Sequence, residues 1–239
     1  MKLDILVFAA HPDDAELSCS GTILKHVAAG KKVGIIDLTR GELGTRGSAE
    51  QRDKEAEAAT EILGIDIREN LRMRDGFFLH DEEHQLQIIK MLRKYQPEIV
   101  LCNALHDRHP DHGKGSELVT RSSFLSGLTK IETKLNGELQ EAWRPRLVLQ
   151  YIQDSYIKPD ILVDVSGYWE KKMESIRAFK TQFFNPEHDE PNSTYISSPE
   201  FLLILEARGR ELGKSIGATY AEGFTCQKLL GVDDLFQLR

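Results

Sequence analysis

Cysteine is scarce in this chain, and its pattern excludes two classes of protein. The 239 residues include three cysteines, Cys19, Cys102 and Cys226, which are widely spaced and form no CxxC pair. Such a set predicts reduced thiols in a cytoplasmic protein rather than a disulfide scaffold or a thiolate zinc site. The apolar run near the N-terminus, about six residues long, is too short for a signal-peptide core or a membrane span. We therefore expect a cytoplasmic protein with no membrane partner.

Excess positive charge is also absent. Lys and Arg total 31 against 38 Asp and Glu, which gives a net charge of -7. Because a phosphate backbone binds basic surfaces, this balance argues against nucleic acid as a partner. The sequence has no GxxxxGK[ST] phosphate loop either. A small anionic substrate in a locally positive pocket remains compatible with this composition.

The hydrophobic pattern predicts alternating strands and helices. Continuous apolar runs such as Ile5–Ala10 and Val33–Leu38 are typical of strands that are covered on both faces of a parallel sheet. Further strands are expected at Leu71–Met73, Ile99–Cys102, Leu147–Ile152 and Ile161–Val165. Helical spacing and capping residues predict helices at Gly21–Ala29, Ser48–Leu63, Glu82–Tyr95 and Gly115–Leu128. This alternation favours an α/β fold with a doubly wound, mostly parallel, Rossmann-like sheet, in one domain over residues 1–239.

The position of a ligand site follows from this topology. If the strand order is the common 3-2-1-4-5, the first and fourth strands lie side by side, and their C-terminal ends form the switch point at which open α/β sheets bind ligands. The segment Asn185–Pro199, rich in Pro, Asn and Ser, is a candidate lid.

Two clusters of imidazoles and carboxylates follow these two strands. The first is His11-Pro12-Asp13-Asp14 and the second is HDRHPDH at 106–112. Alone, HPDD can be a proline-containing turn and HxxH is a weak signal, but both lie where the fold brings strand ends together. Imidazole and carboxylate ligands suit a zinc site with one open position, or iron(II) in the same ligands. We expect the metal ligands to be His11, Asp14 and His112.

The remaining polar residues suit hydrolysis of an amide. Zinc lowers the pKa of bound water from about 15.7 to about 7 and polarises a carbonyl. Asp13 is then free to act as the general base. We expect His109, held in its protonated form by Asp111 or another carboxylate, to stabilise the oxyanion and protonate the departing amine.

These motifs resemble those of a known family. AHPDDAE after the first strand, TRGELGTRGSAEQRDKEAEAA after the second, DRHPDH after the fourth and YAEGF near the C-terminus resemble the LmbE-like, or PIG-L, zinc deacetylases over nearly the whole chain. Two further segments, PDILVDVSGYWEKKMESIRAFKTQF and LEARGRELGKSIGATYAEGF, are similar to the bacillithiol-biosynthesis branch. That branch removes acetyl from N-acetylglucosaminyl malate.

The resemblance implies the same roles for the residues that match its motifs. It places His11, Asp14 and His112 on zinc, Asp13 as base, and His109 with Asp111 as a charged pair. It also implies a homo-oligomer such as a hexamer.

The resemblance further places Arg52 and Arg108 in the substrate pocket, where guanidinium groups suit a malate carboxylate or sugar hydroxyls. From the residues alone, Arg52 would instead be an exposed helix residue paired with Glu55. The sequence departs from the family pattern at Phe201, where related enzymes often carry an oxyanion-binding tyrosine. Tyr195 is the nearest substitute, although an ordinary loop aromatic is an equal alternative.

Other functions fit parts of the sequence. A deacetylase or amidase for another glucosamine conjugate, such as a thiol S-conjugate or a chitooligosaccharide, would use the same residues. A metal-containing binding module or a metallophosphoesterase is the alternative from another class. A binding module would have no need of Asp13 or His109, because neither is required to hold the metal.

Overall fold

The computed structural model describes residues 1–184 and 193–238. Its main feature is a seven-stranded sheet with the order β3-β2-β1-β4-β7-β9-β8. These strands are β1 (Ile5–Ala9), β2 (Val33–Thr39), β3 (Ile67–Met73), β4 (Ile99–Cys102), β7 (Leu147–Tyr151), β8 (Ile161–Asp164) and β9 (Ala221–Thr225). A separate short hairpin joins β5 (Lys134–Leu135) to β6 (Glu138–Leu139). The sheet is parallel from β3 to β7, and β9 pairs antiparallel with both β7 and β8.

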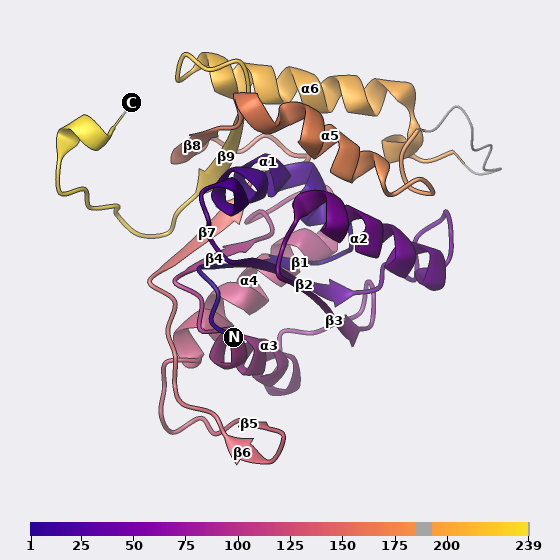
Figure 1. Cartoon of the computed structure of the whole chain (residues 1–239). Helices are drawn as coiled ribbons and strands as arrows, with labels where there is room; N and C mark the ends of the chain where they lie inside the picture. Colours follow the sequence, from indigo (N-terminus) through magenta and orange to yellow (C-terminus); the bar gives the residue numbers. More distant parts are fainter. Residues whose placement is uncertain (185–192, 239) are drawn as a thin grey trace.

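Helices cover both faces of this sheet (Figure 1). They are α1 (Asp14–Ala28), α2 (Ala49–Leu63), α3 (Glu82–Tyr95), α4 (Pro110–Leu125), α5 (Trp169–Arg177) and α6 (Pro199–Lys214). One core lies between the sheet and α3 and α4, and a second lies between the sheet and α1. A third apolar cluster joins α2, α5 and α6, so α5 and α6 form an additional layer outside α1 and α2. None of the helices within the described ranges is long and apolar enough to cross a membrane.

The predicted α/β fold with a mostly parallel sheet is confirmed. Ile5 of β1 pairs with Val33 of β2 on one side and with Ile99 of β4 on the other, so the first and fourth strands are neighbours. The predicted order 3-2-1-4-5 describes the parallel part of the sheet, with β7 as its fifth strand. The C-terminal ends of β1 and β4 therefore lie together.

Capping residues fix one helix as predicted. Ser48 Oγ accepts a hydrogen bond from the Gln51 N–H at 3.2 Å, and Gln51 Oε1 accepts one from the Ser48 N–H at 2.8 Å. This reciprocal capping box begins α2. Gly64, in the left-handed conformation with φ 65°, ends it.

Two helices begin earlier than predicted. The helix expected at Gly21 begins at Asp14, and the helix expected at Gly115 begins at Pro110. Their first turns carry the polar site residues, which interrupt the apolar spacing that marks the rest of each helix. Acidic groups at a helix N-terminus and proline at its first position both favour these starts.

The elements after β8 were not predicted. They include α5, α6 and β9, and the last of these inserts between β7 and β8. Of the candidate lid, residues 185–192 lie outside the described residues. The remainder forms a short 3-10 helix, Tyr195–Ser197, and the start of α6 at Pro199.

Candidate functional site

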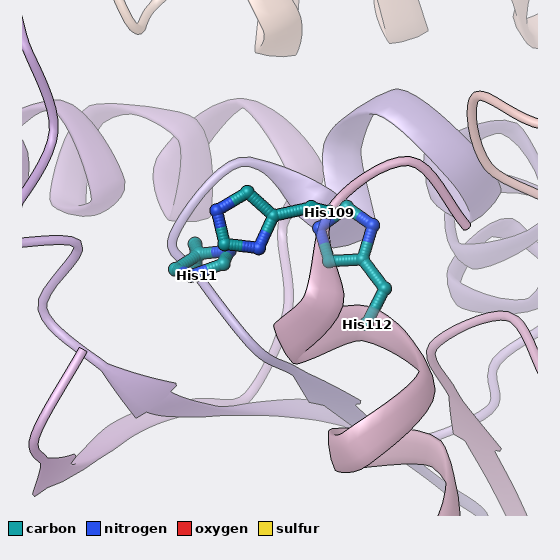
Figure 2. A group of neighbouring side chains, drawn as sticks. All are labelled: His11, His109 and His112. Carbon is teal, nitrogen blue, oxygen red and sulfur yellow. The ribbon is translucent and has the colours of Figure 1, made fainter. Parts of the chain in front are cut away.

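Three imidazoles meet at the C-terminal ends of β1 and β4 (Figure 2). His11 follows β1, whereas His109 and His112 belong to the start of α4. The ring centroids of His11 and His109 are 4.6 Å apart, and those of His109 and His112 are 5.2 Å apart. His109 is the N-cap of α4, and its Nδ1 accepts a hydrogen bond from the Asp111 N–H at 3.3 Å. The two loops expected to converge do so.

The Asp14 carboxylate lies between two of these rings. Its Oδ2 is 3.6 Å from His11 Nδ1, and its Oδ1 is 3.1 Å from His112 Nε2. The side-chain amides of Asn103 and Gln153 each donate to it at 3.0 Å. Burial alone would raise the pKa of Asp14, but the His112 charge and hydrogen bonds from both imidazoles hold that pKa well below its usual range.

This arrangement fits a tetrahedral metal ion. Ligand atoms at about 2.0–2.1 Å from zinc lie about 3.4 Å from one another along a tetrahedral edge. The separations of 3.6 Å from Asp14 Oδ2 to His11 Nδ1 and of 3.1 Å from Asp14 Oδ1 to His112 Nε2 are close to that length, with each carboxylate oxygen facing one imidazole. Within the described ranges, the side-chain groups that could hold a metal are His11, His109 and His112, and also His11, Asp75 and Asp111. Of the expected ligands, His11 and His112 belong to the first group, His11 also belongs to the second, and Asp14 belongs to neither.

The outer nitrogen of each candidate ligand imidazole faces a carboxylate. His11 Nε2 lies 3.0 Å from Asp75 Oδ1, and His112 Nδ1 lies 2.6 Å from Asp107 Oδ2. Such contacts fix the orientation and tautomer of a metal-binding histidine. Burial would raise the pKa of Asp107, but hydrogen bonds from His112 and from the backbone lower it to about 2.

Sequence reasoning missed both of these carboxylates. Asp107 stands inside the second motif, next to residues that were assigned roles, and Asp75 follows β3 at the same edge of the sheet. Their positions just beyond strand ends were a usable signal for both. Asn103, after β4, and Gln153, after β7, also lie just beyond the ends of strands.

Asp13 is buried beside this cluster in an unusual backbone conformation. Its φ is 127°, a region that non-glycine residues rarely adopt, and its side chain is 8% exposed. Arg52 Nη1 lies 3.5 Å from Asp13 Oδ2. Burial raises the pKa of Asp13 to about 7, with Arg52 acting to lower it and Asp14 to raise it. A carboxyl group with this pKa suits proton transfer near neutral pH.

The contacts of Asp111 differ from those expected. Its carboxylate accepts hydrogen bonds from the Gly76 N–H at 2.8 Å and from Lys114 Nζ at 3.0 Å, and lies 3.5 Å from His11 Nε2. It touches His109 through its backbone N–H instead. Burial, together with the neighbouring imidazoles, lowers the pKa of His109. The Asp111 carboxylate thus has hydrogen-bond partners other than the His109 ring, although its charge acts to raise the pKa of His109 against the effect of burial.

Arg52 points into the site rather than to solvent. Its side chain is 7% exposed, and Nη1 also lies 3.4 Å from the Pro12 carbonyl. The alternative of a surface pair with Glu55 is wrong in this respect, since Glu55 accepts hydrogen bonds from the Thr181 N–H and hydroxyl at 2.7 and 2.9 Å. A Cβ at Gly41 would come within 2.6 Å of Arg52 Nη1, so glycine gives the guanidinium its space.

Arg108 and Tyr195 lie together near the cavity mouth, joined by Asp154. Arg108 Nε is 3.3 Å from Asp154 Oδ2, and the Tyr195 hydroxyl donates to Asp154 Oδ1 at 3.1 Å. The Arg108 guanidinium lies 4.9 Å from the centroid of the Tyr195 ring. Phe201 packs edge-on against Tyr195, with centroids 5.3 Å apart. The Tyr195 ring thus contacts Phe201, which occupies the position of the expected tyrosine, while the Tyr195 hydroxyl is bonded to Asp154.

All nine predicted site residues except Asp111 line one cavity of about 470 Å³. Its polar lining includes the imidazoles and most of the carboxylates described above. Its apolar lining includes Leu17, Trp169, Phe201, Leu205 and Leu212. The cavity is therefore bounded by the switch point of the sheet and by the outer helices α5 and α6.

The fold is that of an α/β protein with a mostly parallel sheet. The cluster at the switch point of this sheet consists of side chains that could hold a metal ion. The chain belongs to the PIG-L family, whose model, described as GlcNAc-PI de-N-acetylase, matches residues 6–123. The predicted family is thereby confirmed. The matched range contains both histidine motifs but ends before α5.

Three similar proteins cover most of the chain. The crystal structure of the conserved protein TT1542 from Thermus thermophilus is 35% identical, with a TM-score of 0.84 over 97% of this chain and 98% of that one. Diacetylchitobiose deacetylase of Thermococcus kodakarensis is 27% identical over 92% of this chain and 81% of its own length. The 4-oxalmesaconate hydratase of Pseudomonas putida is 26% identical over 91% of this chain and 86% of its own.

Proposed function

We propose that this protein is a zinc-dependent hydrolase that removes the acetyl group from the nitrogen of an N-acetylglucosamine conjugate. The observation that carries the proposal is the Asp14 carboxylate between His11 and His112, with Asp13 buried next to it in the same cavity. Family membership and the chitobiose deacetylase relative support the reaction class. We further propose a single-domain, cytoplasmic, homo-oligomeric enzyme.

His11, Asp14 and His112 would hold the metal, with iron(II) as the alternative ion. When bound, zinc would polarise the amide carbonyl and make water acidic. Asp13 takes a proton from the attacking water, because its pKa of about 7 suits that transfer near neutral pH. Once it is a carboxylic acid, Asp13 is also able to return this proton to the departing amine nitrogen.

His109 is proposed to stabilise the oxyanion. Its Nδ1 accepts a hydrogen bond from the Asp111 N–H, so Nε2 carries the proton in the neutral ring and is free to donate. Its lowered pKa favours this neutral form. Protonation of the amine by His109, with Asp111 as its partner, is the alternative assignment. The two assignments differ in the pH profile expected for kcat in an H109Q variant. If His109 acts as the general acid, the fall of kcat at alkaline pH seen in the wild type should be lost, whereas it should remain if His109 is a neutral donor.

The charges near the cavity favour a substrate with an anionic or hydroxyl-rich part. Arg52 lies inside the cavity, and Arg108 lies near its mouth beside Tyr195. Guanidinium groups bind carboxylates in a forked geometry. Together with the sequence motifs of the bacillithiol-biosynthesis branch, this supports N-acetylglucosaminyl malate as the substrate. A chitooligosaccharide and a thiol S-conjugate are the alternatives.

A substrate panel measured on zinc-loaded protein tests the proposal. Release of acetate is followed for the malate conjugate, diacetylchitobiose and an N-acetylglucosaminyl thiol conjugate, and hydration is followed for 4-oxalmesaconate. The D13N variant serves as the control, because it retains the metal ligands. Acetate release that needs both zinc and Asp13 supports the proposal. Hydration of 4-oxalmesaconate without acetate release from any conjugate would overturn it.

A further inference from the structure

A buried ion pair lines the cavity but has no part in the proposed reaction. Lys172 Nζ on α5 lies 2.7 Å from Glu222 Oε1 on β9, and their side chains are 2% and 3% exposed. Both residues line the same cavity as Asp13. A buried ion pair is weak evidence for stability, because removing two charges from water offsets most of their attraction. The role of the Lys172–Glu222 pair is therefore better inferred from its contacts with the rest of the protein than from the attraction between its two charges.

Both members of the pair bind the backbone of α1. Lys172 Nζ donates to the Leu17 carbonyl at 2.7 Å. Glu222 accepts from the Gly21 N–H at 2.9 Å and from the Thr22 N–H at 2.7 Å. In an α-helix the carbonyl of residue 17 is the partner of the N–H of residue 21. The pair therefore binds both groups of one helical hydrogen bond, within the body of α1.

The absence of a side chain at Gly21 makes this approach possible. A Cβ at that position would lie 3.0 Å from Glu222 Oε1 and 2.8 Å from the Val165 Cβ. Because glycine lowers helix stability, its presence inside a helix usually has a packing or functional reason. Here the glycine allows a carboxylate to contact the helix backbone.

The Lys172 contact with Leu17 is about one helical turn from Asp13, the proposed general base, and the Glu222 contact with Gly21 is about two turns from it. The Leu17 N–H donates to the Asp13 carbonyl at 2.9 Å, so the residue bound by Lys172 is itself bonded to Asp13. Asp13 has φ 127°, and such a conformation persists only where the surroundings hold it. Asp14, in the same turn, lies between the two imidazoles.

We propose that the Lys172–Glu222 pair positions the first turn of α1, and through it Asp13 and Asp14. The inference rests on the proposed function for the roles of these two carboxylates. Lys172 and Glu222 are positioning residues, because they act through the helix backbone. The elements that carry them, α5 and β9, lie beyond the segment that matches the family model.

The double variant K172M/E222M tests this role without leaving a buried charge unpaired. Replacing both members of a buried ion pair by apolar residues of similar size is often neutral for folding. In the double variant the Leu17 carbonyl and the Gly21 N–H still have each other as helical partners, and the first turn loses its anchor. We expect kcat to fall about 10- to 100-fold with KM nearly unchanged, and the zinc Kd to rise by a similar factor, as for other groups that orient metal ligands.

The matched control is K94M/E69M, which removes an ion pair of 2.8 Å between α3 and β3. We expect its kcat and zinc Kd to stay within twofold of the wild type. If K172M/E222M does not fold, E222Q replaces it, since glutamine keeps the shape but has one acceptor for two backbone N–H groups. The E222Q variant should show a smaller loss of kcat and of zinc affinity.

The outcomes separate the two proposals. A folded double variant with wild-type kcat and wild-type zinc affinity overturns the positioning role. If the wild-type protein releases no acetate from any conjugate, the proposed function fails, but zinc titration still decides whether the pair positions Asp14. The K172R variant keeps a charged donor at this position. A kcat for K172R above that of K172M/E222M would support the inference, whereas equal losses of kcat in K172R and K172M/E222M would count against it.

Discussion

The contact between Asp107 and His112 gives the sharpest quantitative prediction. Asp107 Oδ2 lies 2.6 Å from His112 Nδ1, on the side of the ring that faces away from Asp14. An Asp107→Asn substitution keeps the size of the side chain but removes its charge. The imidazole then loses a charge-assisted hydrogen bond that orients it and makes it a stronger ligand.

The expected effect is a zinc Kd raised by about 10- to 100-fold, which corresponds to about 1.4–2.7 kcal/mol of binding free energy. The Asp107 side chain is 1% exposed and that of His112 is 11% exposed, so solvent does little to screen this contact. The amide oxygen of the variant can still accept a hydrogen bond from the ring, but its NH2 group then faces the Ser155 N–H, whose partner in the wild type is Asp107 Oδ1. We expect kcat to fall as well, because the ring turns more freely.

The assay is zinc titration against a competing chelator, with kcat measured at saturating zinc. The surface pair of Asp81 and His84 provides a matched control, since its atoms are also 2.6 Å apart but its side chains are 42% and 17% exposed. The D81N variant should bind zinc as the wild type does. A D107N protein with wild-type zinc affinity would refute the assignment of His112 as a ligand that Asp107 orients.

Further predictions concern other parts of the molecule. The acid limb of kcat/KM should lie at or below about pH 7, because Asp13 must be ionised to act as a base and a bound zinc ion would lower its pKa further. A D13N variant should lose turnover but retain zinc. Replacing Arg52 by Met should move that limb to higher pH, because Arg52 lowers the pKa of Asp13, and an unmoved limb in the pH profile would contradict this. The Y195F variant should alter KM more than kcat, since the hydroxyl of Tyr195 is bonded to Asp154. Replacing Ser48 by Ala should lower the free energy of unfolding by about 1 kcal/mol in urea titrations, through loss of the α2 cap.

Local patterns in the sequence predicted the parallel half of the sheet well. The apolar run of β4 and the helix between Asp81 and Pro97 were found with their observed limits, because each is bounded by an unambiguous turn or capping residue. The convergence of His11 and His112 followed from strand order alone. These features depend on short-range spacing and on one topological rule.

The rest depended on contacts between residues far apart in the chain. The start of α1 at Asp14 was missed because its first turn is polar and buried, and buried polar residues leave no apolar period. The antiparallel insertion of β9 could not be inferred, because the β8-to-β9 connection passes through two helices. The engagement of Asp111 with Gly76 and Lys114, rather than with His109, is likewise a tertiary detail.

The place of β9 in the sheet has a consequence for how the protein matures on the ribosome. This strand is translated after every other strand, yet it inserts between β7 and β8 and carries Glu222 to the backbone of α1. A nascent chain can therefore assemble β1 to β4 while the turn that holds Asp13 still lacks its last support. A chain truncated before residue 221 would contain the whole segment that matches the family model but would lack Glu222 and its contacts with α1.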